Sequence, residues 1–540
     1  MTNESVGENV GQNANQNPAL ERTLPSVPAP KSMDAIMSLC KRRGFIFQAS
    51  DIYGGLNGFW DYGPLGAQLK KNLRDAWWQD MILNPCWGKK GPNGERVQCV
   101  PVETRIIQHP RAWQASGHVG GFNDPMVDCK ETKNRYRYDH VKVYVPASGE
   151  PGDKPLFAFV PGTASEAKQL KKAEKAFGKA DVVALTTILV ERFAKVLGPD
   201  AEKVGSLTEP KQFNLMFKTY VGATAGEDDI AYLRPETAQG VFLQFKNVVD
   251  STRVRMPFGI GNTGTSFRNE VTPRNFTFRS REFDQMELEF FCHPSESMDW
   301  FNFWREFRMK WWESIGLAGE NLRLYDTPKK DLAHYSLAGS DVEYRFPFTS
   351  PDFGELEGVA HRGNYDLTQH QEHSKIKLEY FDQDRGELLP NGSKRGEKYL
   401  PHCIEPAAGL DRGVLAILCE GYTRDESRPS PEFLKLNPRV APIKAAIFPL
   451  VNKDGMPEVA DKLYEEIFAR FGRTGFIETD AKQSIGKRYA RMDEAGCPYC
   501  FTIDGETLTN QTVTVRDRDT GAQSRIGMDK VTAFMTEKLG

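Results

Sequence analysis

The chain has 540 residues and a mass of 60.9 kDa, which at roughly 150 residues per domain predicts about three or four domains. Hydrophobic residues make up 39% of the chain and charged residues 26%, a globular balance that excludes global disorder and a collagen-like structure. Lys and Arg number 70 against 73 Asp and Glu, so at a net charge of −3 any nucleic-acid binding must use local basic patches.

The cysteine content and the N-terminal sequence bear on location. Nine scattered cysteines form no disulfide framework, which favours a reducing compartment. Residues 1–30 lack the basic start and apolar centre of a secretory signal, and no apolar run approaches the roughly 18 residues of a membrane span. We therefore expect a cytoplasmic protein with no membrane association.

Composition divides the chain into a tail, a large globular part and a smaller C-terminal part. Residues 1–32, rich in Asn, Gln, Ser and Pro, predict a disordered tail. Globular composition runs from residue 33 to 437, and Pro429, Pro431 and Pro438 mark a break at its end. Alternating strand and helix patterns over residues 438–540 predict a separate α/β domain.

Helical patterns stand out at two places in the large globular part. The segment Gly66–Leu83 spaces Leu69, Leu73, Trp77 and Met81 at helical intervals, which predicts a helix with one buried stripe. Residues 153–207 differ in composition, because Lys and Ala dominate their first half. The helical patterns there cover Ala164–Lys179 and Val182–Leu197, and we predict a helical insertion over 153–207.

Two motifs suggest chemistry that their context does not support. Gly259, Gly261 and Gly264 match the dinucleotide fingerprint G-x-G-x-x-G, but strand residues follow where a helix should open, so a Gly-rich turn is the favoured interpretation. Cys497 and Cys500 have the spacing of a metal or redox pair without a second pair nearby, which favours two packed thiols. A P-loop sequence does not occur.

The most informative stretch runs from Phe267 to Phe291. Two β-rich runs flank a Pro/Asn turn at 271–275, which predicts an antiparallel hairpin with a long loop. Period two along the second run separates a polar face from an apolar face. An aromatic ring between guanidinium and carboxylate groups suits a planar ligand with phosphates, although an outward strand face is often merely charged and solvated. The polar face comprises Arg279, Arg281, Phe283, Gln285, Glu287 and Glu289, and the apolar face Phe278, Met286, Leu288 and Phe290.

A second element carries related chemistry further along the chain. His402–Glu405 is strand-like, the chain turns at 406–411, and Arg412 begins the apolar helix Gly413–Leu418. An arginine in the first turn of a helix adds to the positive end of the helix dipole, which makes a phosphate site. A lone arginine there is usually structural, so its meaning depends on lying near Arg268.

Several blocks of sequence stand out together, in one order along the chain. They are Leu233–Gly240, Phe267–Glu270, Arg281–Glu287, Gly354–Arg362 and Glu405–Arg412, supported by Trp113–His118, Asp124–Asp128, Leu207–Pro210 and Phe213–Phe217. Together these blocks resemble the glycyl-tRNA synthetases of the homodimeric type. The resemblance runs from about residue 33 to the C-terminus and implies an α+β fold. In that fold, a class II core with an antiparallel sheet forms a catalytic domain at 33–437, and 438–540 is an anticodon-binding domain.

For ATP, the resemblance implies a site on the antiparallel sheet. Arg268 matches the arginine on the α-phosphate and Arg412 the arginine on the γ-phosphate side, and these two are the expected catalytic residues. Glu270 matches the residue near the adenine amine, and Phe283 the ring under adenine. Mg²⁺ is expected with ATP, and no site made of protein ligands alone is expected. Further ATP contacts are expected from Asn269, Phe278, Arg279, Ser280, Arg281, Glu282, Glu355, Leu356, Gly409, Leu410 and Asp411.

For the amino acid, the resemblance implies contacts whose types suit glycine. Glycine offers an ammonium and a carboxylate, so Glu236, Glu287 and Glu405 are expected to hold the ammonium, and larger amino acids are excluded sterically. The family usually has Ser at the position of Ala407; losing one neutral hydrogen bond costs roughly 0.5–1.5 kcal/mol, which weakens glycine binding without abolishing activity. The other expected contacts are Arg137, Phe283, Asp284, Gln285, Met286, Pro406, Ala407, Ala408 and Gly409.

The implied activity is ATP-dependent formation of glycyl-adenylate and transfer of glycine to the 3′ end of tRNA(Gly) by a cytoplasmic homodimer. Two alternatives stay open: a non-catalytic nucleic-acid-binding relative of the fold, and a ligase for another small amino acid such as threonine or proline. The retained nucleotide-site residues favour a ligase, and the Leu233–Gly240 and Gly354–Arg362 blocks favour glycine. Candidate phosphate contacts for tRNA, with solvated surface charge as their alternative, are Lys435, Arg439, Lys444, Arg473, Lys487, Arg488 and Arg491, and the Lys-rich insertion is a candidate contact for the acceptor arm.

Overall fold

The structure is a computed structural model that describes residues 31–148, 152–223, 226–317, 319–389, 392 and 394–539. The predicted tail at 1–32 lies outside these residues except for its last two. Lys31 Nζ donates to the carbonyl oxygens of Cys419 and Glu420, at 2.9 and 2.6 Å. Ser32 caps helix α1 (Met33–Arg43). The folded part therefore begins by residue 31.

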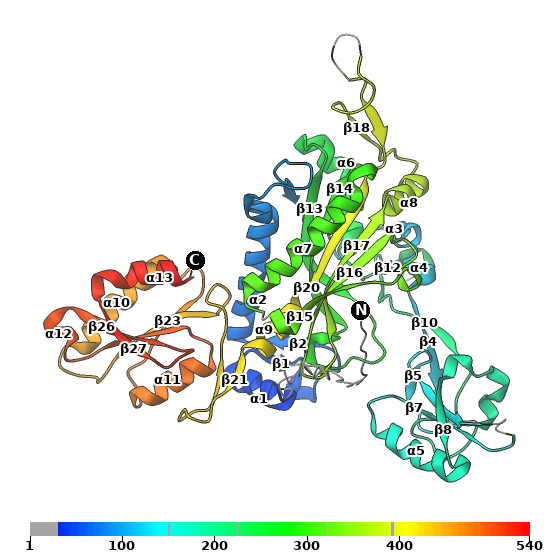
Figure 1. The fold of residues 1–540 in the computed structure, drawn as a ribbon, viewed down its shortest axis with the longest axis horizontal. Coiled ribbons are helices and arrows are strands. Elements are labelled where there is room, and N and C mark those ends of the chain that lie inside the picture. Colours follow the sequence, from blue (N-terminus) through cyan, green and yellow to red (C-terminus); the bar gives the residue numbers. More distant parts are fainter. Residues whose placement is uncertain are drawn as a thin grey trace, which may run out of the picture.

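A seven-stranded sheet forms the centre of the molecule (Figure 1). Its neighbouring strands are antiparallel, except for the short edge strand β3, which runs parallel to β13. The predicted hairpin is confirmed as the pair β13 and β14, in register from Phe258 opposite Phe291 to Phe267 opposite Glu282. In spatial order the strands are β15 (Leu322–Asp326), β16 (Ala338–Tyr344), β17 (Gly354–Gly363), β20 (His402–Gly409), β14 (Glu282–Cys292), β13 (Phe258–Phe267) and β3 (Cys99–Pro101).

Helices cover both faces of this sheet. On one face, α2 (Pro64–Trp78), α7 (Ser297–Ile315) and α9 (Leu410–Gly421) share the main core with Met286, Leu288 and Phe290 of β14. Leu69, Leu73, Trp77 and Met81 are fully buried there, which confirms the predicted stripe, although its last turn is a π-helix at Gln79–Leu83. On the other face, α6 (Ala238–Thr252) packs over Phe258 and Phe291, with α3 (Pro110–Ala115) and α8 (Tyr365–Ser374) beside it.

The three glycines of the dinucleotide-like motif lie inside strand β13. The rejection of a Rossmann site agrees with this placement, but the predicted Gly-rich turn is wrong. Close packing explains the residue type, because a Cβ on Gly261 would lie 2.2 Å from Ile82 Cδ1 and one on Gly264 2.1 Å from Arg234 Nη2. Neighbouring side chains therefore occupy the space above the strand.

The insertion is an α+β unit with its own core, at the lower right of Figure 1. Helix α5 (Ala164–Phe177) confirms the first predicted helix, whereas the helix predicted over Val182–Leu197 is wrong. That segment forms β8 and β9 joined by short 3-10 turns. Its β-branched residues pair as strand, in β8 with β6, which precedes residue 153, and in β9 with β7. The strands are β6 (Lys142–Pro146), β7 (Leu156–Phe159), β8 (Ala180–Ala184) and β9 (Val196–Leu197), and a smaller sheet of β10 (Lys211–Asn214), β4 (Asn123–Asp128) and β5 (Arg135–Arg137) joins the unit to the main body.

The C-terminal α/β part lies on the other side of the central sheet from the insertion (Figure 1). It has a separate core, and Cys497 and Cys500 are buried thiols beside it. Its sheet has the order β24 (Phe476–Thr479), β23 (Ile443–Pro449), β25 (Tyr499–Ile503), β26 (Thr512–Asp517) and β27 (Gln523–Gly527), with helices α10 (Met456–Phe471), α11 (Ile485–Glu494), α12 (Thr507–Asn510) and α13 (Val531–Leu539).

Smaller elements complete the fold. None of the helices in the described ranges is long and apolar enough to cross a bilayer. The remaining elements are β1 (Ile46–Gln48), β2 (Trp60–Tyr62), α4 (His118–Gly121), β11 (Lys218–Tyr220), β12 (Ile230–Tyr232), β18 (Tyr380–Asp382), β19 (Glu397–Tyr399), β21 (Tyr422–Arg424) and β22 (Glu432–Leu434).

Candidate active site

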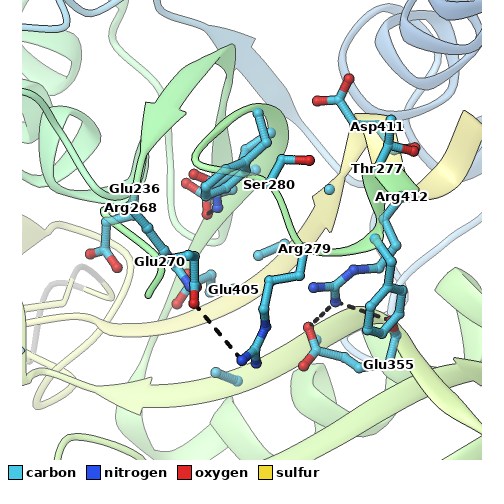
Figure 2. A pocket seen from close by; sticks show the side chains of 18 of the residues that line it. Glu236, Arg268, Glu270, Thr277, Arg279, Ser280, Glu355, Glu405, Asp411 and Arg412 are labelled. Carbon is cyan, nitrogen blue, oxygen red and sulfur yellow. Dashed lines mark hydrogen bonds and ion pairs between the residues drawn. The ribbon is translucent and has the colours of Figure 1, made fainter. Parts of the chain in front are cut away.

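A cavity of about 340 Å³ lies over strands β14, β17 and β20, on the sheet face that α6 covers further along (Figure 2). The loop between β13 and β14 and the start of α9 close its sides. This volume is in the usual range of ligand sites. The residues that line the cavity are Glu236, Arg268, Glu270, Thr277, Phe278, Arg279, Ser280, Phe283, Gln285, Glu287, Tyr335, Glu355, Gly358, Ala360, Glu405, Ala407, Gly409, Asp411 and Arg412.

Strand alternation decides which predicted residues reach this cavity. Along β20, Glu405, Ala407 and Gly409 line it, while along β14 Phe283, Gln285 and Glu287 do so. Their neighbours face the other way. Four residues predicted to contact a substrate are instead fully buried in the main core: Met286, Leu356, Ala408 and Leu410. These four do not line the cavity, and neither do Asn269, Glu282 and Pro406.

Three charged residues predicted in the site instead have structural partners. Arg281 donates to the backbone carbonyls of Glu270 and Asn57, which ties the loop between β13 and β14 to the β1–β2 connection. Arg137 pairs with Asp124 and Asp139 at the root of the insertion. Asp284 pairs with Lys70 at 3.1 Å and accepts from the Thr265 hydroxyl at 2.7 Å. None of the three lines the cavity.

Arginines and aromatic rings mark one part of the cavity, the arginine end, which extends from Arg412 to Arg268 beside Glu236 (Figure 2). Arg268 Cζ lies 5.4 Å from the centre of the Phe283 ring, and its Nε donates to the carbonyl of Pro235 at 3.0 Å. Arg412 Cζ lies 4.6 Å from the centre of the Phe278 ring. Figure 2 shows Arg412 reaching Glu355, whose carboxylate accepts from Nη1 at 2.8 Å. Two arginines 144 residues apart in sequence (412 minus 268) therefore line one cavity.

The position of Arg412 is fixed by its neighbour Asp411. One carboxylate oxygen of Asp411 accepts from the Tyr62 hydroxyl and from Lys70 Nζ, each at 2.6 Å. The other accepts from the backbone N–H of Asp284 at 2.6 Å. These contacts hold the first turn of α9 against β14, so the helix N-terminus and Arg412 both present positive charge to the cavity.

Carboxylates gather at the other end of the cavity around one buried arginine. Arg362, which is 2% exposed, donates to Glu405 at 2.5 Å and to Asp366 at 2.8 Å, and lies 3.9 Å from Glu236. The Tyr335 ring stacks on its guanidinium at 4.2 Å. Arg362, Gly358 and Ala360 belong to the block Gly354–Arg362, for which the resemblance implied no role at these three positions. Tyr335 and Thr277 gave no signal in the sequence, because these loop residues reach the cavity only through the fold.

The protonation of these carboxyls differs. Burial alone would raise the pKa of Glu236, but His118, at 3.3 Å, and Arg362 lower it below its ordinary value. Burial and the charge of Glu236 raise the pKa of Glu287 to about 7. Burial, together with Glu287 and Glu236, raises the pKa of Glu405 to about 8 despite its contact with Arg362. An ammonium group would supply the missing positive charge here.

Of the basic residues predicted to contact tRNA, two are buried in the C-terminal part. Lys444 is 2% exposed and donates to two backbone carbonyls, and Arg488 is 1% exposed and donates to three. The phosphate contacts predicted for these two are wrong, because a buried group that is already paired cannot reach a backbone phosphate. Arg439 pairs with Asp80 at 2.7 Å, whereas Lys435, Arg473 and Lys487 are exposed.

Comparison with known proteins decides the family. The family model of the tRNA synthetase class II core domain (G, H, P, S and T) matches residues 220–423, and that of the anticodon binding domain matches residues 444–538. A glycine–tRNA ligase of Rhodopirellula baltica is 48% identical over 94% of this chain and 99% of its own length. The chain belongs to the glycine–tRNA ligase family.

Other glycine–tRNA ligases agree. That of Caldanaerobacter subterraneus is 43% identical over 95% of this chain and 100% of its own, and that of Staphylococcus epidermidis 42% over 94% and 99%. The predicted class II fold with a C-terminal anticodon-binding domain is confirmed, as is a ligase that forms aminoacyl-tRNA. The non-catalytic alternative is not favoured.

Proposed function

We propose that this glycine–tRNA ligase works through the cavity described above, in two steps. A glycine carboxylate oxygen attacks the α-phosphorus of ATP, which forms glycyl-adenylate and releases pyrophosphate. A hydroxyl at the 3′ end of tRNA(Gly) then attacks the glycyl carbonyl carbon, and AMP leaves. The observation that supports this most is that one cavity joins two distant arginines to a cluster of carboxylates.

The arginine end is assigned to ATP. Arg268 takes the α-phosphate and stabilises the charge that builds there during attack, while Arg412 takes the γ-phosphate side. Phe283, beside Arg268, supplies the ring under adenine, and Glu270 accepts from the adenine amine. Arg279 lies 3.8 Å from Glu270 Oε2, close enough to adjust its position when nucleotide enters.

The chemistry of the cavity wall fits Mg²⁺ bound together with ATP. Mg²⁺ keeps several waters and takes one or two carboxylates plus phosphate oxygens. Among the described residues, no three or more His, Cys, Asp or Glu side chains are grouped so that they could hold a metal ion. The Glu355 carboxylate, on the Arg412 side, would hold the ion with the phosphates. When bound, Mg²⁺ neutralises phosphate charge.

The carboxylate end is assigned to glycine. Glu236, Glu287 and Glu405 surround the ammonium, which brings the charge that the free site lacks. The small residues Gly358, Ala360 and Ala407 line the floor, and Tyr335 with Arg362 fills the space beside Glu405. A larger amino acid must displace packed side chains, so exclusion is steric. No residue acts as a nucleophile, and catalysis is positioning and charge stabilisation.

Membership of this family supports a proposal for the setting of the enzyme. We propose a homodimer in the cytoplasm, with residues 33–437 as the catalytic domain and 438–540 as the anticodon-binding domain. Exposed Lys435, Arg473 and Lys487 are the proposed phosphate contacts of tRNA.

Aminoacylation of tRNA(Gly) by the purified chain tests the function. We expect glycine to be attached in the presence of ATP and Mg²⁺, with alanine, serine, threonine and proline attached at least about a hundredfold less efficiently, because the site offers no room for a side chain. Attachment of threonine or proline in preference to glycine, or of no amino acid at all, would contradict it.

A further inference from the structure

Glu236 is held by the protein at both carboxylate oxygens. Oε1 accepts from Gln239 Nε2 at 3.0 Å and lies 3.9 Å from Arg362 Nη2. Oε2 lies 3.3 Å from His118 Nε2. Figure 2 places Glu236 beside Arg268 on the cavity wall. A carboxylate fixed in this way has little freedom to turn, so its direction is set before any substrate arrives.

His118 is in turn fixed on every side. Its Nδ1 lies 2.8 Å from Ser116 Oγ, and its ring packs edge-on against Trp113, with centroids 5.6 Å apart, and against Phe122 at 5.4 Å. The side chain is 13% exposed and does not line the cavity. Its second nitrogen, Nε2, faces the Glu236 carboxylate. The block Trp113–His118, conspicuous in the sequence, thus contacts the site through His118.

We infer that His118 is a positioning residue: through its contact with Glu236 it aims that carboxylate at the ammonium of the amino acid, without touching the substrate itself. This inference rests on the proposed function, because it takes the carboxylate end as the amino-acid site. The charged groups that face Glu236 are His118 from α4, Arg362 from β17, Glu287 from β14 and Glu405 from β20. Among these carboxyls, Glu236 is the one whose pKa is lowered, and contact with His118 is the main cause that opposes its burial.

Substitution of His118 tests this role by separating effects on the two small substrates. Removing a hydrogen bond to a charged group costs about 10- to 100-fold, so His118→Ala is expected to raise the KM for glycine by that factor in ATP–pyrophosphate exchange. The KM for ATP and the rate at saturating glycine should stay within about threefold. His118→Gln can place an amide N–H near the position of the His118 Nε2, so its KM for glycine should return most of the way to the wild-type value.

A second variant changes the support of His118 without removing its ring. Ser116→Ala removes only a neutral hydrogen bond on the far nitrogen and should raise the KM for glycine about two- to tenfold. This milder variant keeps the test decisive if His118→Ala does not fold.

The chain offers a matched control outside the cavity. His293 Nδ1 lies 2.7 Å from Ser295 Oγ and its Nε2 3.6 Å from Glu397 Oε1, which repeats the Ser–His–Glu arrangement on another part of the surface. His293→Ala should leave the KM for glycine unchanged. The inference is overturned if wild-type exchange depends on glycine but His118→Ala and Ser116→Ala keep the wild-type KM, or if His293→Ala raises it equally. Wild-type enzyme without glycine-dependent exchange would overturn the proposed function itself.

Discussion

At the scale of single residues, charge balance in the carboxylate cluster governs substrate binding. Glu236, Glu287, Glu405 and Asp366 surround Arg362, so negative groups outnumber the one arginine among them. The free site compensates by keeping protons on carboxyls whose pKa is raised. Glycine brings an ammonium that replaces such a proton. Binding of the amino acid and loss of a proton are therefore linked.

This linkage predicts how glycine affinity depends on pH. The pKa of Glu287 is about 7 and that of Glu405 about 8 in the free site, both above the ordinary value. At pH values below these pKa values the two carboxyls are protonated and neutral, so they do not attract the glycine ammonium by charge. The Kd for glycine should therefore fall as pH rises from about 6 to 8, by up to tenfold per unit for each proton released.

Isothermal titration in buffers of different ionisation enthalpy measures the proton release directly. Glu287→Gln cannot ionise and should flatten the dependence. A Kd that stays constant over this range, with no proton released, would contradict the linkage.

At the scale of elements, the sequence was most informative where a period could be read. Alternation along β14 predicted that Phe283, Gln285 and Glu287 share the strand face that carries the site. The same alternation places Met286 on the opposite face, in the core. Arg362 and Tyr335 escaped prediction because their roles depend on a contact between β17 and a distant loop. The helix predicted over Val182–Leu197 is wrong because strand pairing with β6, a tertiary effect, overrides the helical pattern of the sequence.

Packing on β13 predicts that Gly261 cannot accept a side chain without loss of stability. Gly261→Ala would press its Cβ against Ile82 and Trp77, and overpacking of this kind costs about 1–3 kcal/mol. Urea unfolding followed by tryptophan fluorescence is well suited, since all nine tryptophans lie between residues 60 and 312, and the C-terminal domain contains none. Gly319→Ala, where a Cβ meets open space in the domain that holds the tryptophans, is the control and should leave the midpoint unchanged. Equal midpoints for both variants would show that β13 has room to relax.

At the scale of the whole molecule, the C-terminal domain is anchored to the catalytic domain by specific contacts. Asn72 of α2 donates to the carbonyls of Val440 and Ala441, and Arg439 pairs with Asp80. Arg42 and Arg43 of α1 both contact Glu494. Basic residues at this junction are therefore used for the fold. The sequence could list the basic residues of this domain, but only burial distinguishes those free to bind tRNA.

The exposed basic residues predict that salt weakens tRNA binding and that this effect does not extend to glycine activation. Lys487→Ala and Arg473→Ala should each weaken tRNA binding and reduce the slope of log Kd against log salt by about one. Glycine-dependent pyrophosphate exchange needs no tRNA and should be unaffected. Filter binding at several salt concentrations measures the slope. An unchanged slope in both variants would assign these charges to the solvated surface.

The central claim is that Arg268 and Arg412, far apart in sequence, act on one ATP beside a glycine held by carboxylates. Glycine-dependent ATP–pyrophosphate exchange by wild type and Arg268→Ala tests it most directly. Loss of one charge-stabilising donor should reduce exchange by about 10²–10³-fold while the variant keeps its wild-type unfolding midpoint. An Arg268→Ala enzyme that is folded and exchanges at the wild-type rate would contradict the account.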